Sequence, residues 1–237
     1  MTHPRSASGA PSSRGRHQRP GKTGSAVAPE GRAAALEQYR RRADRYDREL
    51  ALFEPIRNDA VACLRLARND TVLDVGCGTG LSFQLFHDRI GEGGRIVGIE
   101  QCPEMLAKAQ QRVEQHRWRN VDLVCAPAAT ARVPVRADAA LFHFTHDVLR
   151  DEAAVDNVLS HLEPGARVVA SGLQWAPPWA WPANGFVMLA AMYSVTSLEG
   201  LGRPWDRLAA RLKDVEVRTL MMGGIYIASG VYSPRRH

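Results

Sequence analysis

The chain has 237 residues, of which 45% are hydrophobic and 24% charged, which is typical of a globular protein with one α/β domain. The formal net charge is +6, but residues 1–32 alone carry +5. The high pI therefore belongs to this tail and gives no support to a nucleic-acid-binding face on the remaining residues. We expect no nucleic acid among the partners.

The four cysteines form no CxxC pair, and no histidine cluster has the spacing of metal ligands; they are Cys63, Cys77, Cys102 and Cys125. We therefore expect no metal site and a reduced, cytoplasmic setting. The N-terminus lacks the apolar core of a signal peptide, so secretion is not expected.

Residues 1–32 are rich in Ser, Gly, Pro and Arg and are predicted to be a disordered tail, either a solvated segment or a basic arm for anionic partners. Residues 33–237 are predicted to form the domain. It begins with a helix over residues 33–46, in which Tyr46 either packs the helix or covers a ligand. A second helix is expected from Pro55 to Leu66.

Residues 71–81, with the sequence TVLDVGCGTGL, are the most informative stretch. Apolar residues from Val72 to Val75 predict a buried strand, and an amphipathic helix is expected from Leu81 to Ile90. Between them, Gly76, Gly78 and Gly80 allow a ligand to lie directly against the backbone. This order of strand, glycine turn and helix predicts a nucleotide-binding unit.

A second predicted strand, residues 95–99, ends at Glu100, 24 residues after Gly76. An acid at this place can accept hydrogen bonds from both hydroxyls of a ribose. A helix to His116 and strands over residues 121–125 and 139–144 are expected next.

The segments VLDVGCGTG and VGIEQCPEML resemble those of class I methyltransferases that use S-adenosylmethionine, over about residues 36–232. The resemblance implies a Rossmann-like three-layer sandwich whose seven-stranded sheet is mostly parallel, with an antiparallel C-terminal strand. It also implies that S-adenosylmethionine is the cofactor and that its methionine amino group is held with the help of Asp74. The cofactor-binding residues that it implies are Tyr46, Asp74, Gly76, Cys77, Gly78, Gly80, Glu100, Gln101, Ala128, Ala129 and Thr145.

The chain departs from the family after the third strand. Members commonly carry an Asp there that binds the adenine amino group, but this chain has Ala126-Pro127-Ala128-Ala129. We expect backbone groups of Ala128 and Ala129 to contact adenine instead.

Thr145, His146 and Asp147 follow the fourth strand, where ligands sit in open parallel sheets. His146 is the candidate for taking a proton from the acceptor, or else a structural histidine. Asp147 is a candidate N-cap of a following helix over residues 151–162. The segment Glu163-Pro164-Gly165 predicts a turn, and residues 167–172 predict the fifth strand.

No charged residue occurs from Val168 to Leu198, yet three prolines argue against a membrane-spanning helix. We interpret this stretch as a lid with a short helix over residues 184–193, or as core or dimer packing. The proposed substrate contacts are His146, Trp175, Trp179 and Trp181. A last helix is expected over residues 201–212, followed by strands over 215–221 and 225–231 that meet at Gly223-Gly224.

The prediction is thus a methyltransferase acting on an O or N nucleophile of a small, partly apolar acceptor, as a monomer or homodimer. Two alternatives remain open: a phospholipid N-methyltransferase in peripheral contact with a membrane, and a non-catalytic S-adenosylmethionine-binding protein. An RNA or protein methyltransferase would need the basic tail, and the Phe-Thr-His-Asp after the fourth strand differs from the Asn-Pro-Pro-Tyr type of motif.

Overall fold

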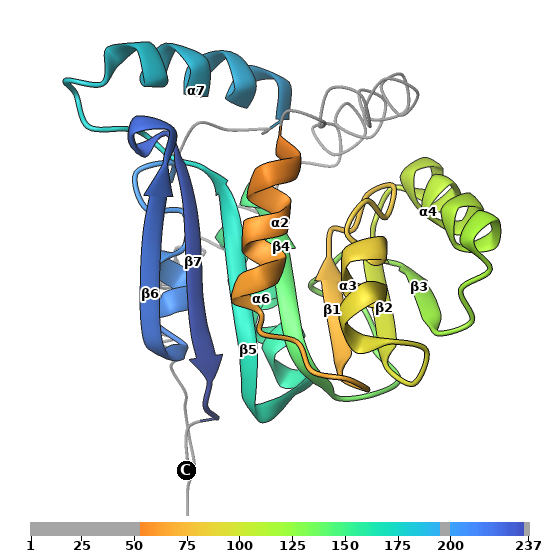
Figure 1. Cartoon of the computed structure of the whole chain (residues 1–237). Coiled ribbons are helices and arrows are strands. Elements are labelled where there is room, and N and C mark those ends of the chain that lie inside the picture. Colours follow the sequence, from red (N-terminus) through yellow and green to blue (C-terminus); the bar gives the residue numbers. More distant parts are fainter. Residues whose placement is uncertain (1–52, 195–199, 235–237) are drawn as a thin grey trace, which may run out of the picture.

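A twisted seven-stranded sheet organises the protein in the computed structural model, which describes residues 53–194 and 200–234 (Figure 1). The strands lie side by side in the order β3-β2-β1-β4-β5-β7-β6. Strands β1 to β5 are parallel where they pair, and β7 is antiparallel to both of its neighbours. The strands are β1 (Thr71–Val75), β2 (Arg95–Glu100), β3 (Val121–Cys125), β4 (Ala137–His143), β5 (Leu162–Leu173), β6 (Leu212–Leu220) and β7 (Ile225–Tyr232).

Helices cover both faces of this sheet, as the resemblance implied. They are α2 (Glu54–Cys63), α3 (Phe83–Ile90), α4 (Pro103–His116), α5 (His146–Arg150), α6 (Glu152–Ser160), α7 (Trp181–Ser194) and α8 (Asp206–Ala209). The predicted helix over residues 33–46, with Tyr46, lies outside the described residues.

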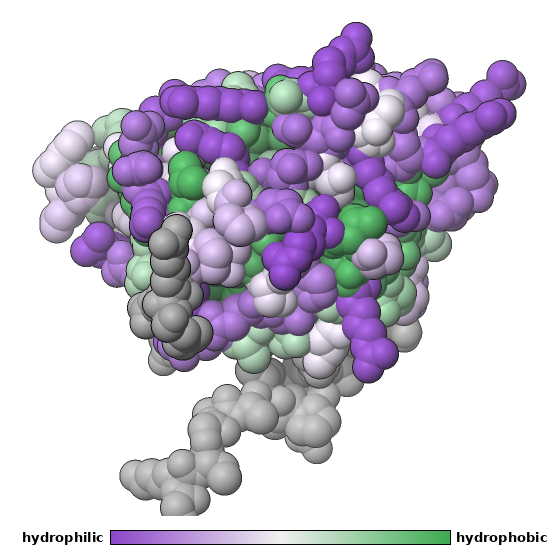
Figure 2. All heavy atoms as spheres, turned by 90° about the horizontal axis from the view of Figure 1, so that it is seen from below, coloured by the Kyte–Doolittle hydropathy of each residue, from purple (hydrophilic) through white to green (hydrophobic). Residues whose placement is uncertain are grey.

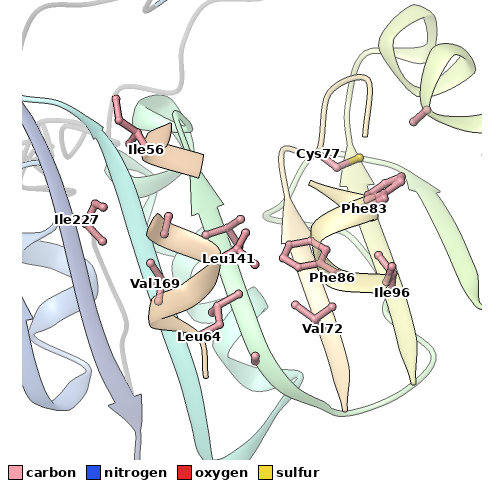
Figure 3. Close-up of a cluster of buried hydrophobic side chains, with 14 of the residues drawn as sticks. Ile56, Leu64, Val72, Cys77, Phe83, Phe86, Ile96, Leu141, Val169 and Ile227 are labelled. Carbon is pink, nitrogen blue, oxygen red and sulfur yellow. The ribbon is translucent and has the colours of Figure 1, made fainter. Parts of the chain in front are cut away.

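The strands bury alternate side chains on opposite faces, because successive residues of a strand point to opposite sides. Val72 of β1 belongs to the apolar cluster that includes α2 and α3, whereas Leu73 belongs to a second cluster that includes α6 and α8. Figure 3 shows the first of these clusters, with Phe83 and Phe86 of α3 packed over β1 and β2. Burial on both faces explains why these parallel strands are apolar almost throughout.

Several predicted boundaries were wrong. The expected turn Glu163-Pro164-Gly165 lies within β5, whose pairing with β4 shifts register between Ala137 and Ala139 to accommodate the extra residues. The expected helix over residues 201–212 is reduced to the four residues of α8, because Leu212 already pairs with Tyr232 in the β6–β7 ladder. The lid helix is longer than expected and begins at Trp181, so this residue is helical rather than part of a loop.

The two ends of the sheet differ in character. The carboxyl ends of β1, β4 and β5 point toward α7 at the top of Figure 1. The opposite end, seen in Figure 2, presents mostly hydrophilic residues with only scattered apolar areas over the described part. Ligands of open parallel sheets bind at the carboxyl ends of the strands, so we expect a ligand site at this end.

Candidate functional site

The glycine turn joins the ends of β1 and β2. The backbone N–H groups of Gly76 and Cys77 both donate to the carbonyl oxygen of Ile99, at 2.8 and 3.0 Å. Gly76, Gly78 and Gly80 all have positive φ, at 70°, 56° and 76°. These are backbone conformations that residues with a Cβ rarely adopt, so the chain needs glycine to make this turn.

Close packing adds a second requirement at Gly76. A Cβ built on this residue would lie 2.5 Å from Cγ2 of Thr145, the residue at the start of α5. The turn after β1 and the segment after β4 are therefore in direct contact. This contact places Thr145, a predicted site residue, beside the glycine turn.

Glu100 at the end of β2 organises the same turn. Its Oε2 accepts a hydrogen bond from the backbone N–H of Gly78 at 3.1 Å, and its Oε1 accepts one from Cys102 at 2.8 Å. Burial raises the pKa of the Glu100 carboxyl, and hydrogen bonds from the backbone N–H groups of Cys102, Gly78 and Gln101 partly offset this shift. The carboxyl group lies where the sequence predicts it, close to the turn.

Asp74, the last but one residue of β1, is 2% exposed. Burial raises its pKa from 3.8 to about 7, while the charge of Arg57 and a hydrogen bond with Ser82 act in the opposite direction. Its Oδ2 has no hydrogen-bond partner within the described part of the chain. A buried, unsatisfied carboxylate oxygen is costly unless a ligand pairs with it.

Arg57 of α2 is a functional candidate that the sequence analysis missed. Its side chain is only 2% exposed and pairs with Glu54. Its charge also acts on Asp74 and on His143 of β4, whose pKa burial and Arg57 together lower to about 3. Arg57 lies next to Ile56 and three and four residues before Ala60 and Val61, so helical spacing already places it on the buried face.

His143, to which the sequence analysis assigned no role, joins the polar groups on the α2 face of the sheet. Its Nδ1 lies 2.8 Å from the Oγ of Ser171, its neighbour in the β4–β5 register. The low pKa keeps this imidazole neutral near pH 7. Asp74, His143 and Ser171 thus place polar groups on three adjacent strands near their carboxyl ends.

The predicted acceptor-facing residues lie at the start of α5. His146 is buried at 8% exposure and lines a small cavity of about 10 Å³ with Ser171 and Tyr226. Asp147 is exposed and lies within the first turn of α5, so the prediction that it caps the next helix was wrong. Asp151 caps α6 instead, because its carboxylate accepts from the N–H groups of Ala153 and Ala154.

The predicted adenine segment follows β3. Asn157 of α6 donates to the carbonyl oxygens of Ala128 and Ala131, at 2.8 and 2.9 Å. This amide fixes the backbone that was expected to replace the missing acid. Gln101 is exposed directly after Glu100. Whether Ala128, Ala129 and Gln101 contact the cofactor stays a prediction.

The predicted substrate tryptophans divide into two groups. Trp175 and Trp179 line an open hollow of about 510 Å³ between the end of β5 and the β6–β7 hairpin, here called the aromatic hollow. Trp181 does not line it and is 76% exposed on α7. The hollow is lined by Gln174, Trp175, Ala176, Pro177, Trp179, Thr219, Leu220, Met221, Met222 and Gly223.

Within the described residues, no group of His, Cys, Asp or Glu is arranged to hold a metal ion. No helix in the same ranges is long and apolar enough to cross a membrane. The four cysteines are all free.

Comparison with known proteins places these features in a family. Residues 72–165 match the family described as "Methyltransferase domain". The chain is 30% identical over 171 residues to a trans-aconitate 2-methyltransferase of Azoarcus sp., covering 67% of this chain and 63% of the relative. It is 26% identical over 185 residues to the aklanonic acid methyltransferase DauC of Streptomyces sp., covering 74% and 84%. Across three curated relatives the match spans 30%, 63% and 84% of their length.

A solved structure shows the same fold. The N-methyltransferase NodS from Bradyrhizobium japonicum, in complex with S-adenosyl-L-homocysteine, superposes with a TM-score of 0.61 at 16% identity. The superposition covers 84% of this chain and 97% of NodS. The fold, the glycine turn with its acidic residue and these sequence matches all point to methyltransferases. The chain contains a methyltransferase domain over residues 72–165 and shares the fold of the class I methyltransferases, whose cofactor is S-adenosylmethionine.

Proposed function

We propose that this protein transfers the methyl group of S-adenosylmethionine to an O or N nucleophile of a small, partly apolar acceptor. One observation carries the proposal: the glycine turn with Asp74 and Glu100 shares the carboxyl edge of the sheet with the aromatic hollow. A polar cradle for the cofactor and an apolar site for an acceptor are the two components that such a reaction needs.

The residues of the cradle fit the cofactor. The unpartnered Oδ2 of Asp74 suits the methionine ammonium group, because a buried carboxylate gains most from a cation. Each oxygen of the Glu100 carboxylate accepts one backbone N–H and keeps a lone pair for a ribose hydroxyl. The positive-φ glycines leave the backbone open to close approach. Cys77 and Thr145 border the same turn.

Methyl transfer demands little proton chemistry from this chain. S-adenosylmethionine, when bound, supplies an electrophilic methyl group on a sulfonium centre that is already a good leaving group. The protein has to align the acceptor and exclude water, which contributes several kcal/mol, of the order of 7–11 at best. A base is needed only for an acceptor that is protonated at working pH. His146 at the start of α5 is the candidate for that role.

A phospholipid N-methyltransferase is the second candidate. It is favoured by the exposure of Trp179 and Trp181, at 71% and 76%, since exposed aromatic side chains suit a membrane interface. A cytoplasmic location and a monomeric or homodimeric state stay predictions. The free cysteines support the former.

Calorimetric titration followed by turnover tests the proposal. We expect S-adenosylmethionine and S-adenosylhomocysteine to bind the full chain, and labelled methyl to appear on apolar phenols or amines. A His146→Gln variant should bind the cofactor normally and lose turnover with phenols more than with neutral amines, because only the phenol has to lose a proton before attack. Binding without turnover on any acceptor would favour a non-catalytic S-adenosylmethionine-binding protein, and absence of binding would overturn the proposal.

A further inference from the structure

The aromatic hollow has the size and composition of a small-molecule site. Its volume of about 510 Å³ lies within the range of ligand pockets, roughly 300–1,000 Å³. None of its ten lining residues is charged. Tryptophan, proline and methionine side chains form the walls, so the hollow suits the apolar or aromatic body of a neutral ligand.

One polar side chain of this hollow has an unmet hydrogen bond. Gln174 is 5% exposed, and its Nε2 donates to the carbonyl oxygen of Gly223 at 2.8 Å. Because a carbonyl can only accept, this bond fixes the orientation of the amide and leaves Oε1 as an acceptor. Oε1 is buried and has no partner within the described residues. A buried acceptor of this kind favours a ligand that brings a donor.

The backbone around Gln174 is held firmly, so the amide is preorganised. The N–H of Gln174 donates to Gly224 at 3.0 Å, and that of Trp175 donates to Leu201 at 2.8 Å. The hairpin tip fits closely against this segment, since a Cβ on Gly223 would lie 2.8 Å from Cδ of Pro177. Little entropy remains to be lost there when a ligand binds.

The mouth of the hollow is adaptable by contrast. Met221 and Met222 are 52% and 54% exposed, and both hold positive φ, at 50° and 56°. Methionine side chains repack easily because they are unbranched and flexible. These side chains border the hollow, and Oε1 is covered in the present conformation, so a ligand donor reaches it only after a local rearrangement.

The aromatic hollow lies at the carboxyl end of β5, beside the carboxyl end of β4. Gln174 directly follows Leu173, the last residue of β5, and β5 pairs with β4. The small cavity lined by His146, Ser171 and Leu173 occupies the space between the start of α5 and this point. The hollow, this small cavity and the cofactor turn thus follow one another along the carboxyl edge of the sheet.

We propose that the aromatic hollow binds the apolar body of the methyl acceptor and that Gln174 selects acceptors carrying an N–H or O–H donor. This inference rests on the proposed function and names its substrate class: neutral aromatic molecules with a donor. Trp179 forms the exposed wall, and the carboxamide of Gln174 supplies the specificity. The acceptor's reacting atom lies at the opposite end, toward His146.

Equilibrium dialysis with two matched probes tests the site. 2-Naphthol carries an O–H donor, and 2-methoxynaphthalene has the same ring without the donor. With S-adenosylhomocysteine present, we expect the full chain to bind 2-naphthol about tenfold more tightly, the size of one hydrogen bond to a buried group. Gln174→Leu should abolish this preference, whereas Gln110→Leu, at an exposed glutamine of α4, should leave it unchanged.

Gln174→Leu also loses the hydrogen bond to Gly223 and could misfold. A second variant therefore keeps the proposal testable. Trp179→Ala truncates a largely exposed ring and should weaken both probes severalfold while keeping their ratio. A preference for 2-naphthol that survives in Gln174→Leu would overturn the proposal, as would equal affinity of both probes for the full chain.

Two further outcomes separate this inference from its rivals. If S-adenosylhomocysteine binds but neither naphthalene does, the hollow assignment fails while the proposed function stands. If S-adenosylhomocysteine does not bind, the proposed function fails first. Sedimentation with phosphatidylcholine vesicles that Trp179→Ala abolishes, together with no naphthalene binding, would make this face a membrane contact and overturn the small-molecule assignment.

Discussion

Asp74 is a carboxyl group whose ionisation should control cofactor affinity. Its pKa of about 7 means that a large fraction is protonated near neutral pH, whereas a ligand ammonium group requires the carboxylate. We expect the affinity for S-adenosylhomocysteine to rise about tenfold from pH 6 to pH 8 and then level off. Calorimetry across this range measures the change.

Asp74→Asn is the control for that prediction, because it keeps the shape of the side chain and cannot ionise. The variant should bind more weakly and show a flat profile over the same pH range. The free protein gives an independent check. The pKa is raised on folding, so the folded state holds this proton more tightly, and the free energy of unfolding should fall from about pH 4 to pH 7. A variant with the same pH slope as the natural chain would contradict the assignment.

Glu100 should contribute to affinity through its charge and through two acceptor oxygens. Replacing it with alanine removes the predicted bonds to the ribose, so we expect S-adenosylhomocysteine affinity to fall about 100-fold, or about 3 kcal/mol. Glu100→Gln keeps one acceptor oxygen and should lose about tenfold. Calorimetry measures both losses.

The exposed Glu92→Gln is the matched control and should bind normally. Thermal unfolding has to accompany these titrations, because Glu100 also accepts from Gly78 and Cys102. Unchanged affinity in a folded Glu100→Ala variant would place the ribose elsewhere.

At the scale of single residues, sequence reasoning found the functional groups that belong to short, continuous sequence motifs. Asp74, the glycines and Glu100 lie within two strand–turn units, and the structure places them together. It missed Arg57 and His143, because their roles come from contacts between α2, β1 and β4 that no local pattern records. The aliphatic neighbours of Arg57 gave a signal of burial, but not of what it faces.

The glycine turn is an element that should tolerate no side chain at Gly76. Alanine there would hold φ near 70° and place its Cβ 2.5 Å from Cγ2 of Thr145. We expect Gly76→Ala to destabilise the protein by about 3 kcal/mol and to lose cofactor binding, since left-handed backbone alone costs about 1–2 kcal/mol. Urea unfolding and S-adenosylhomocysteine titration measure the two effects.

Gly165 offers a matched control for the backbone effect. It also has positive φ, at 93°, but nothing lies within 4 Å of a Cβ built there. Gly165→Ala should therefore lose only about 1–2 kcal/mol and bind normally. Thr145→Ser, which removes Cγ2, should restore part of the stability of Gly76→Ala. Equal losses in the two glycine variants would show that the contact with Thr145 is unimportant.

Among the elements, the periodic ones were predicted best. The strands β1, β2 and β3 and helix α4 match their predicted ranges to within a residue or so, because apolar periodicity and glycine or proline boundaries mark them. The short helix α5 was missed and α8 was overestimated. Their few residues are fixed by packing of Leu149, Trp205 and Leu208 against the sheet rather than by local propensity.

For the whole molecule, the order of strands could not be read from periodicity. Nothing local distinguishes the order β3-β2-β1-β4-β5-β7-β6 from other arrangements of the same strands. The family resemblance implied only a mostly parallel seven-stranded sheet with an antiparallel C-terminal strand, which the structure confirms. The aromatic hollow likewise depends on the β6–β7 hairpin meeting the segment after β5, a contact between residues about 50 positions apart.

The basic tail gives the last prediction, since it carries most of the net charge without belonging to the predicted domain. Deleting residues 1–32 lowers the formal charge from +6 to about +1. Because the cofactor cradle and the aromatic hollow lie within residues 74–223, we expect unchanged affinity for S-adenosylhomocysteine and unchanged turnover of small acceptors. Any binding of the full chain to RNA should be weak, fall steeply with salt and disappear on deletion. Turnover that requires the tail would instead indicate a nucleic acid or protein acceptor, recruited by the positive charge that the tail supplies.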